Sequence, residues 1–199
     1  MTAIRRAEGA DLGAITRMLV QAYMRDPVAM WMCPSAQLRA RTLYALYSPR
    51  LPQMLGCGEI WTEDARTSAA VWLAPNAKKP GVRPEPSLLR CLLDPRLTVR
   101  LPLLALGLRR MERAHPHDRP HWYLSLLGTD PATQGQGRGS AALRPVLERC
   151  DADGVGAYLE SSNPNNQGFY TRHGFREMRT LSLPSGPTLS LMWREPQSE

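Results

Sequence analysis

A glycine-rich turn between a predicted strand and a predicted helix constrains this chain more than any other feature. The turn reads Gln134-Gly135-Gln136-Gly137-Arg138-Gly139, after an apolar run at 121–127 and before a helical stretch that reaches about 150. A strand that enters a helix through such a turn presents free backbone N–H groups at the helix N-terminus, where the helix dipole also favours an anion. Glycine at 137 and 139 has no side chain that would keep a phosphate from the backbone. The sequence therefore predicts a phosphate-binding cradle.

Spacing alone leaves three interpretations of this turn open. A Walker loop ends in Gly-Lys-Ser/Thr, whereas this turn ends in Arg138-Gly139-Ser140. A dinucleotide fingerprint of the form GxGxxG fits at Gly135 and Gly137 but needs a glycine where Ser140 stands. The third interpretation is a flexible turn that binds no ligand. The residues of the turn alone do not decide among them.

Hydrophobic periodicity and turn residues predict strands and helices that alternate around one sheet, a mixed α/β order in a single domain over residues 1–199. Asp26-Pro27 is expected to end the first helix, and the second is expected to end at Ser48-Pro49 or shortly after. The proline-rich segment 75–86 is expected to be a surface connection. The predicted strands are 4–7, 59–62, 68–73, 121–127, 155–160, 175–183 and 188–193. The predicted helices are 11–23, 37–51, 87–93, 97–111, the one from the glycine turn to about 150, and 165–172.

Composition narrows the class of protein. Hydrophobic residues make up 43% and charged residues 22% of 199 residues, which is typical of a globular domain. The first residues are polar and the apolar runs are too short to span a bilayer, so we expect a cytoplasmic protein without a membrane partner. The formal charge is +7, but the arginines are scattered, so nucleic acid is not an expected partner. The four separated cysteines are expected to be reduced. His115, His117 and His121 leave a metal site open, although their prolines favour a loop entering a strand.

Two motifs in the expected order resemble the GNAT family of N-acetyltransferases. Gln134, Gly137 and Gly139 match the family's Q/R-x-x-G-x-G/A motif, and it follows a strand that ends near Thr129. Downstream, the family's N…(F/L)Y…GF segment is similar to Asn163, Asn166, Phe169-Tyr170 and His173-Gly174-Phe175. The resemblance implies the GNAT fold, a mixed and mostly antiparallel sheet that splays between two parallel strands and is flanked by helices. It also implies acetyl-CoA as co-substrate, with no metal.

The family pattern further implies which residues hold the cofactor. Backbone groups of Leu127, Gly128 and Thr129 are expected along the pantetheine arm, like an added strand. The residues expected around the pyrophosphate are Gln134, Gly135, Gln136, Gly137, Arg138, Gly139 and Ser140. Asn163 and Asn166 are expected to bond the cofactor from the next segment, although either could instead cap the short helix that follows.

Direct transfer from a thioester to an amine needs a base and an acid rather than a nucleophile, and the resemblance assigns both. Tyr170 is expected to be the general acid that assists departure of the thiol, with a core aromatic as the alternative. Glu160, near the end of its strand, is expected to remove the amine proton directly or through water. The alternative for Glu160 is a carboxylate that pairs with a nearby arginine.

The acceptor is expected to be a primary amine of a small molecule, such as an antibiotic or an aminonucleoside-like metabolite. Asp26 is a candidate for binding a cationic amine, and Met30, Trp31 and Met32 for an apolar wall. Trp72 is expected in the sheet core. A protein or peptide acceptor and a non-catalytic CoA-binding regulatory domain remain alternatives, and the chain is expected to be a monomer or a homodimer.

Overall fold

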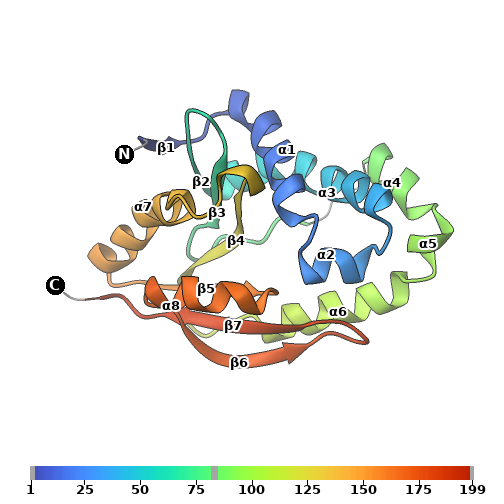
Figure 1. The fold of residues 1–199 in the computed structure, drawn as a ribbon. Helices are drawn as coiled ribbons and strands as arrows, with labels where there is room; N and C mark the ends of the chain where they lie inside the picture. Colours follow the sequence, from blue (N-terminus) through green and yellow to red (C-terminus); the bar gives the residue numbers. More distant parts are fainter. Residues whose placement is uncertain (1–2, 82–84, 198–199) are drawn as a thin grey trace.

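The computed structural model describes residues 3–81 and 85–197, so part of the segment 75–86 lies outside the described residues. Runs of helices and runs of strands succeed one another along the chain around one sheet (Figure 1). No helix of the described ranges is long and apolar enough to cross a membrane. The strands are β1 (Ile4–Arg6), β2 (Gly58–Glu63), β3 (Ser68–Leu73), β4 (His121–Thr129), β5 (Gly156–Ser161), β6 (Arg176–Ser182) and β7 (Thr188–Arg194). The helices are α1 (Leu12–Tyr23), α2 (Pro27–Met32), α3 (Ala36–Cys57), α4 (Pro86–Leu92), α5 (Pro95–Thr98), α6 (Leu101–Ala114), α7 (Arg138–Asp153) and α8 (Gln167–Arg172), with short 3-10 turns η1 (Gly9–Asp11), η2 (Pro131–Thr133) and η3 (Pro164–Asn166).

The strands that the structure describes form one sheet in the order β1-β2-β3-β4-β5-β7-β6. β4 and β5 are parallel, and the other neighbouring pairs are antiparallel. The two parallel strands pair over His121–Leu124 and Gly156–Leu159. Beyond these residues β4 stays paired with β3, and β5 stays paired with β7. This confirms the predicted mixed, mostly antiparallel sheet that splays between two parallel strands.

Alternating residues of each strand pack against different helices, which gives the domain three layers. Tyr123 and Tyr158 face a core shared with α1, α3 and α6. Their neighbours Leu124 and Leu159 face a second core shared with α7 and α8. In Figure 1, α6 runs along the β6–β7 hairpin, while α7 and α8 lie on the other face. The opening between β4 and β5 therefore has helices on both sides.

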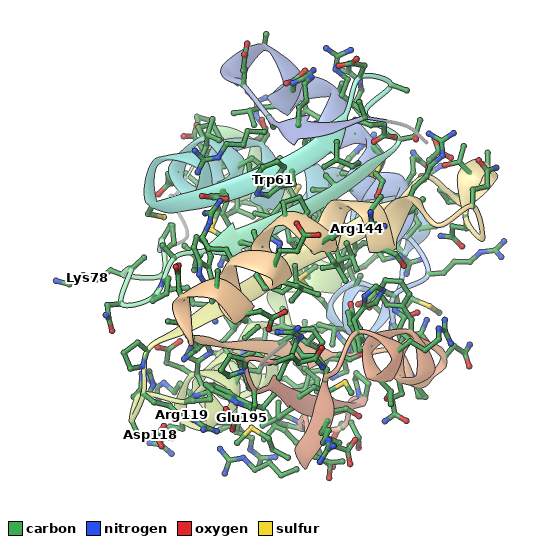
Figure 2. The ribbon with its side chains drawn as sticks, turned by 90° about the vertical axis from the view of Figure 1, so that its left-hand side faces the viewer. Trp61, Lys78, Asp118, Arg119, Arg144 and Glu195 are labelled. Atoms are coloured by element: carbon green, nitrogen blue, oxygen red, sulfur yellow. The ribbon has the colours of Figure 1, made fainter. Side chains whose placement is uncertain are left out.

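The loop that precedes β4 is fastened to the last strand. The Arg119 guanidinium lies 3.7 Å from the ring centre of Trp193 and pairs with Glu195 at 3.0 Å. Figure 2 shows Asp118, Arg119 and Glu195 together at this end of the molecule, far from Trp61 and Arg144. These contacts fix the path of the segment between α6 and β4.

The second predicted helix was expected to span 37–51 and to end at Ser48-Pro49 or shortly after, and this predicted end is too early. α3 continues to Cys57 and contains both Pro49 and Pro52. Each proline removes one helix donor, a loss that normally ends a helix. Leu51 and Met54, both 0% exposed, pack into the main core, and that burial outweighs the lost backbone hydrogen bonds.

α2 was not predicted, because Asp26-Pro27 was taken only as a helix stop. The same pair begins the next helix: the Asp26 side chain accepts a hydrogen bond from Ala29 N at 2.9 Å, and Pro27 occupies the first helical position. An N-cap aspartate followed by proline is a start signal as well as a stop signal. The pair Asp26-Pro27 therefore marks both the end of α1 and the start of α2.

A buried carboxylate joins the N-terminal strand to the β2–β3 turn, and we predict that it contributes to stability. Asp11 is 2% exposed and accepts hydrogen bonds from Arg5 at 2.7 Å and from Arg66 at 2.7 Å. The pKa of Asp11 is below its ordinary value despite burial, chiefly because of the hydrogen bond from Arg5. The hydrogen bonds from the backbone N–H of Glu8 and from Arg66 lower it further. Because the folded-state pKa is depressed, this stabilisation is present above about pH 4 and is lost as the pH falls through the folded pKa.

Asp11→Asn is therefore expected to lower the free energy of unfolding at pH 7 by about 1–2 kcal/mol, the size of charge-assisted hydrogen bonds. The difference from the unsubstituted protein should shrink in strong acid, as urea unfolding at several pH values would measure. Asp64→Asn is the matched control, because Asp64 also pairs with Arg5 but is 81% exposed and should contribute little. Equal losses from both substitutions would contradict the prediction.

Candidate active site

The opening between β4 and β5 begins where β4 carries a bulge. Val71 of β3 pairs with Leu126, and Trp72 pairs with Leu124, so Ser125 has no partner on β3. Leu124 is also the last residue of β4 that pairs with β5. A bulge bends its strand and increases the local twist. The bend at Ser125 accordingly separates the two parallel strands and exposes the backbone edge of residues 125–129.

One donor of that edge already has a partner within the protein. Leu127 N donates to the Tyr23 hydroxyl at 3.2 Å, and Tyr23 is the last residue of α1. Burial first, then the nearby Tyr47, Tyr170 and Asp26, raises the pKa of Tyr23, so its hydroxyl stays protonated. The backbone N–H that the sequence analysis assigned to a pantetheine arm is bonded to this hydroxyl in the structure.

The glycine turn forms a concave run of backbone donors at the start of α7. Gly135 and Gly137 have φ values of 76° and 75°, in the left-handed region that glycine adopts without strain. The first i→i−4 hydrogen bond of α7 runs from Ala141 N to Gly137 O at 3.0 Å. The backbone N–H groups of the residues just before Ala141 therefore have no acceptor within the helix. A Cβ at Gly135 or Gly137 would meet nothing within 4 Å, so the space in front of the turn is open. Free donors, the helix dipole and open space together fit a pyrophosphate.

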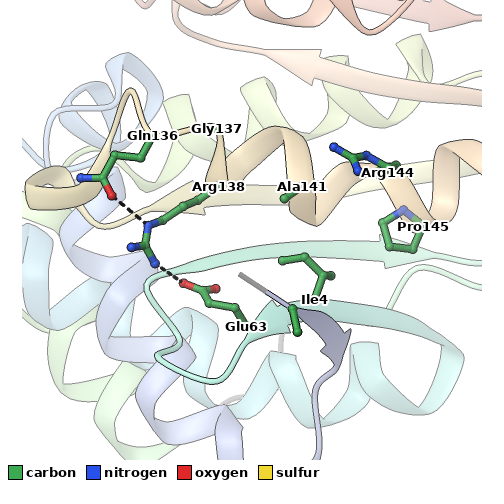
Figure 3. A pocket seen from close by; sticks show the side chains of 9 residues that line it. Ile4, Glu63, Gln136, Gly137, Arg138, Ala141, Arg144 and Pro145 are labelled. Carbon is green, nitrogen blue, oxygen red and sulfur yellow. Dashed lines mark hydrogen bonds and ion pairs between the residues drawn. The ribbon is translucent and has the colours of Figure 1, made fainter. Parts of the chain in front are cut away.

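The side chains of the turn hold its shape. Gln134 donates to Thr129 O at 3.2 Å, which ties the turn to the end of β4. Figure 3 shows Arg138 directed away from the turn, toward Glu63, with Gln136 accepting from its Nε. The Arg138–Glu63 distance is 3.2 Å, and Glu63 is 1% exposed. The pocket drawn there lies between β1 and α7 and is lined by neither Tyr170 nor Glu160. Arg138 therefore contributes its backbone N–H to the cradle, while its charge neutralises Glu63.

The neighbouring predicted residues also have structural partners. Ser140 Oγ lies 2.9 Å from His173 Nε2, which joins the first turn of α7 to the end of α8. Thr129 Oγ1 lies 3.1 Å from Ser68 Oγ. A Cβ at Gly128 would come within 2.6 Å of Leu19, so α1 approaches β4 closely only because this residue is glycine. A Cβ at Gly139 would be in ordinary contact with Phe169 at 3.6 Å.

The two predicted asparagines differ in what they do in the structure. Asn163 Oδ1 accepts from Asn165 N at 3.1 Å and so caps η3, the alternative that the sequence left open. Asn166 precedes α8, is exposed and makes no capping hydrogen bond there. Of the pair, Asn166 is the amide that has no role in capping a helix.

Tyr170 lies on α8 in the second core, beside Leu124 and Leu159 where the strands part. Phe169 and Phe175 contact its ring edge-on, with centroids 5.2 and 6.0 Å away. Burial, and then the charge of Asp26, raises its pKa. The group is therefore a protonated phenol at neutral pH, able to donate a hydrogen bond.

Glu160 lies on β5 with its side chain on the opposite face from Tyr170, among residues of the first core. Its side chain is 3% exposed and accepts hydrogen bonds from Tyr123 at 3.1 Å and Tyr158 at 3.3 Å. His115 Nδ1 is 3.6 Å from Glu160 Oε1. Burial by itself raises the pKa of Glu160, but the imidazole of His115 and the charge of Lys79 outweigh it, so the pKa is below its ordinary value. The partners are a histidine and two tyrosines rather than the arginine considered as the alternative.

On the acceptor side, Asp26 and Trp31 have roles in the fold. Besides capping α2, Asp26 accepts a hydrogen bond from Ser162 at the end of β5. Trp31 donates to Pro184 O at 3.1 Å, and its indole fills the space above Gly107 and Gly186. Trp31 thus links α2 to α6 and to the β6–β7 turn instead of standing free as a pocket wall. Met30 is 47% exposed, Met32 is partly buried, and Trp72 is 0% exposed in the core as predicted.

Two residues at the opening, Tyr23 and His115, were not predicted from the sequence to belong to the site. Tyr23 was read only as part of the apolar face of its helix, and nothing in the local sequence points its hydroxyl at β4. His115 was grouped with His117 and His121 as a loop or metal cluster, but it lies beneath the sheet against Glu160. The described residues contain no group of three or more side chains placed to hold a metal ion.

Comparison with known proteins agrees with this geometry. Residues 106–175, which include the cradle, β5 and α8, match the model of the acetyltransferase (GNAT) family. An uncharacterized N-acetyltransferase from Schizosaccharomyces pombe is 24% identical over 211 residues, with 99% of this chain and 85% of that protein covered. The crystal structure of histone acetyltransferase HPA2 and related acetyltransferase from Corynebacterium glutamicum has a TM-score of 0.70 at 23% identity, covering 100% of this chain and 99% of the other. The NatC complex bound to Gag peptide and CoA has a chain with a TM-score of 0.54 at 12% identity, covering 98% of each.

Proposed function

We propose that this protein is an N-acetyltransferase of the GNAT family that transfers the acetyl group of acetyl-CoA directly to a primary amine of a small molecule. The observation that carries the proposal is the opening between β4 and β5, which Glu160 approaches from one face of the sheet and Tyr170 from the other. A group inserted between the strands would have the carboxylate on one side and the phenol on the other. Direct transfer to an amine requires that pairing of base and acid.

The cradle residues would hold the cofactor, which supplies an activated acetyl thioester when bound. The N–H groups at the start of α7 would bind its pyrophosphate, and Asn166 is an exposed amide at the start of α8, the helix whose Phe169 lies near Gly139. The backbone edge of β4 would take the pantetheine arm, with Tyr23 releasing or sharing the Leu127 N–H. These assignments need no side-chain charge from Arg138.

Glu160 and Tyr170 have protonation states that suit their proposed roles. Two tyrosine hydroxyls donate to Glu160, which fits an ionised, acceptor-only carboxylate that can take an amine proton directly or through water. Tyr170 remains a phenol and can donate to the sulfur as it leaves. The Tyr170 hydroxyl makes no hydrogen bond with the described residues, so that donor is free for a ligand.

A small acceptor is favoured over a protein chain by the position of Trp31. A protein or peptide acceptor needs an open groove on the acceptor side. The indole of Trp31 joins α2 to α6 and to the β6–β7 turn, which narrows that side. In addition, residues 120–175 resemble puromycin N-acetyltransferase, so aminonucleoside antibiotics are the first acceptors to test. Antibiotic inactivation in the cytoplasm is the role that this resemblance suggests.

A thiol-release assay with purified protein and acetyl-CoA would test the proposal. The panel should contain small primary amines, including puromycin, and peptides with free N-termini or lysine side chains. We expect turnover on at least one small amine and none on the peptides. Turnover on peptides alone would favour a protein acetyltransferase, and acetyl-CoA binding without turnover would favour a non-catalytic CoA-binding domain.

Gly137→Ala is expected to weaken acetyl-CoA binding. An alanine at φ 75° is strained by about 1–2 kcal/mol, and relief of that strain would turn the N–H groups of the cradle out of alignment. If the free energy of acetyl-CoA binding falls by a similar amount, the Kd of acetyl-CoA measured by calorimetry should rise about tenfold. Gly154→Ala at the other end of α7 is the matched control, because φ is 66° there and a Cβ also meets nothing within 4 Å. Equal Kd values for the two variants would contradict the assignment of the cradle.

A further inference from the structure

Glu160 is almost fully enclosed by protein, so a proton that it accepts from an amine needs a route to water. Its side chain is 3% exposed, and Tyr123 and Tyr158 both donate to it. A tyrosine hydroxyl that donates to a carboxylate has a raised pKa here and does not carry a proton away at neutral pH. Besides Lys79, the imidazole of His115 lies beside the carboxylate, with Nδ1 3.6 Å from Glu160 Oε1, slightly beyond hydrogen-bond distance.

His115 connects this buried carboxylate to a second histidine and to the surface. It follows the last residue of α6, and its side chain is 13% exposed. Its Nε2 lies 3.3 Å from His121 Nε2, and its ring centroid lies 5.5 Å from that of the exposed His117. The rings of Tyr123 and Tyr158 contact it edge-on at 4.8 and 5.0 Å, which holds the imidazole plane in place.

The hydrogen bonds around the two histidines determine which nitrogens carry protons. His121 Nδ1 is 3.0 Å from Arg119 O, and a carbonyl only accepts, so Nδ1 of His121 carries its proton. Burial lowers the pKa of His121, so its Nε2 is an acceptor. His115 must then donate from Nε2 to His121. His115 therefore faces Glu160 with an unprotonated Nδ1, which is buried and has no hydrogen-bond partner among the described residues. This nitrogen is free to take up a proton that Glu160 receives.

The proposed reaction produces such a proton. An amine that enters as an ammonium ion forms a bond to the acetyl carbon as the bond from that carbon to sulfur breaks. Of the two protons that the nitrogen loses, one ends on the sulfur and one must leave the protein. A carboxylate that is almost fully buried cannot return that proton to water by itself.

We propose that His115 is a positioning residue that acts through Glu160, fixing its carboxylate and relaying the amine proton from it toward His117 and solvent. The inference rests on the proposed function of Glu160 as the base. One proton moves from nitrogen to Glu160, from Glu160 to His115 Nδ1, and from the imidazolium to water, so no other reactant is needed. His121 accepts from Nε2 and holds the ring with Nδ1 toward the carboxylate.

Several other charged or titratable groups face this cluster, and the pH dependence of the relay belongs to all of them together. Arg179 of β6 donates to Ala114 O, Lys79 lies 4.4 Å from the ring centre of Tyr123, and Arg119 covers Trp193. The full set is Arg50, Lys79, His117, Arg119, His121, Tyr123, Tyr158, Glu160 and Arg179.

The protonation states can be tested without knowing the acceptor amine. Nitrogen NMR of the neutral histidine rings should find His121 protonated on Nδ1 and His115 protonated on Nε2, with Nδ1 of His115 unprotonated. A His115 that carries its proton on Nδ1 would overturn the proposal, because that nitrogen could not then accept a proton from Glu160.

The relay itself can be tested with an amine that the thiol-release panel identifies. His115→Gln keeps an amide donor beside Glu160 but cannot take up a proton, and we expect kcat to fall about tenfold or more with KM for acetyl-CoA unchanged. His115→Ala should show a similar fall, and added imidazole should restore its rate in proportion to concentration. Arg113→Ala, at an exposed residue of α6 outside the relay, is the control and should keep the unsubstituted rate.

The outcomes separate this proposal from the function on which it rests. If Glu160→Gln is inactive while both His115 variants keep the unsubstituted rate, the relay is wrong and the base assignment stands. A slow His115→Ala that does not respond to imidazole also overturns the relay. If Glu160→Gln itself is fully active, the proposed base is wrong, whatever the His115 variants do.

Discussion

Replacing Glu160 by glutamine is expected to lower kcat/KM for acetyl transfer about 10²- to 10⁴-fold, the range that general acid–base catalysis contributes. Glutamine has nearly the same shape and can still accept hydrogen bonds from Tyr123 and Tyr158. It cannot take a proton from the amine. Because Glu160 lies on β5 away from the cradle, the Kd of acetyl-CoA should not change, which calorimetry would measure alongside the initial rates.

Glu148→Gln provides the matched control for that substitution. Glu148 is exposed on α7 and belongs to neither the cradle nor the opening between the strands. Its variant should have the rate of the unsubstituted protein. A Glu160→Gln protein that is folded and equally fast would remove Glu160 as the base and leave the amine to lose its proton elsewhere.

The second large effect is expected at the phenol on the other face of the sheet. Tyr170→Phe removes only a hydroxyl, and we expect kcat to fall about 10²-fold because the departing sulfur loses its hydrogen-bond donor. The ring contacts with Phe169 and Phe175 remain, so the thermal midpoint of unfolding should change little. The KM for acetyl-CoA should also be close to that of the unsubstituted protein.

A tyrosine elsewhere separates the role of this hydroxyl from the general effect of removing one. Tyr44 on α3 is 44% exposed, and Tyr44→Phe should leave kcat unchanged. If the leaving thiol needs no hydrogen-bond donor, the kcat of Tyr170→Phe will be as high as that of Tyr44→Phe. That result would return Tyr170 to the position of a core aromatic.

The sequence predicted the elements that local patterns determine. The strand, glycine turn and helix around Gly137, the β2–β3 hairpin and the short helix that carries Tyr170 all follow from periodicity and turn chemistry within a few residues. The mostly antiparallel sheet that splays between β4 and β5 came from the resemblance to a family, and the structure confirms it.

What the sequence missed depends on contacts between distant segments. α3 passes through two prolines because Leu51 and Met54 are buried by other elements, a gain that no local window contains. The Trp31 indole is held by Gly107 and Gly186, which are far from it in sequence. His115 meets Glu160 only because α6 ends beneath β5, so a cluster that looked like a loop or a metal site is part of the carboxylate's environment.

The central claim, direct acetyl transfer to a small amine, can be tested by following an isotopically labelled acetyl group. The protein would be incubated with labelled acetyl-CoA and an equimolar mixture of puromycin, simple primary amines and peptides, and every component would be examined by mass spectrometry. The account predicts that the label appears on the nitrogen of a small amine and that the protein itself stays unlabelled. Label that accumulates on the protein, or on the peptides alone, would contradict it.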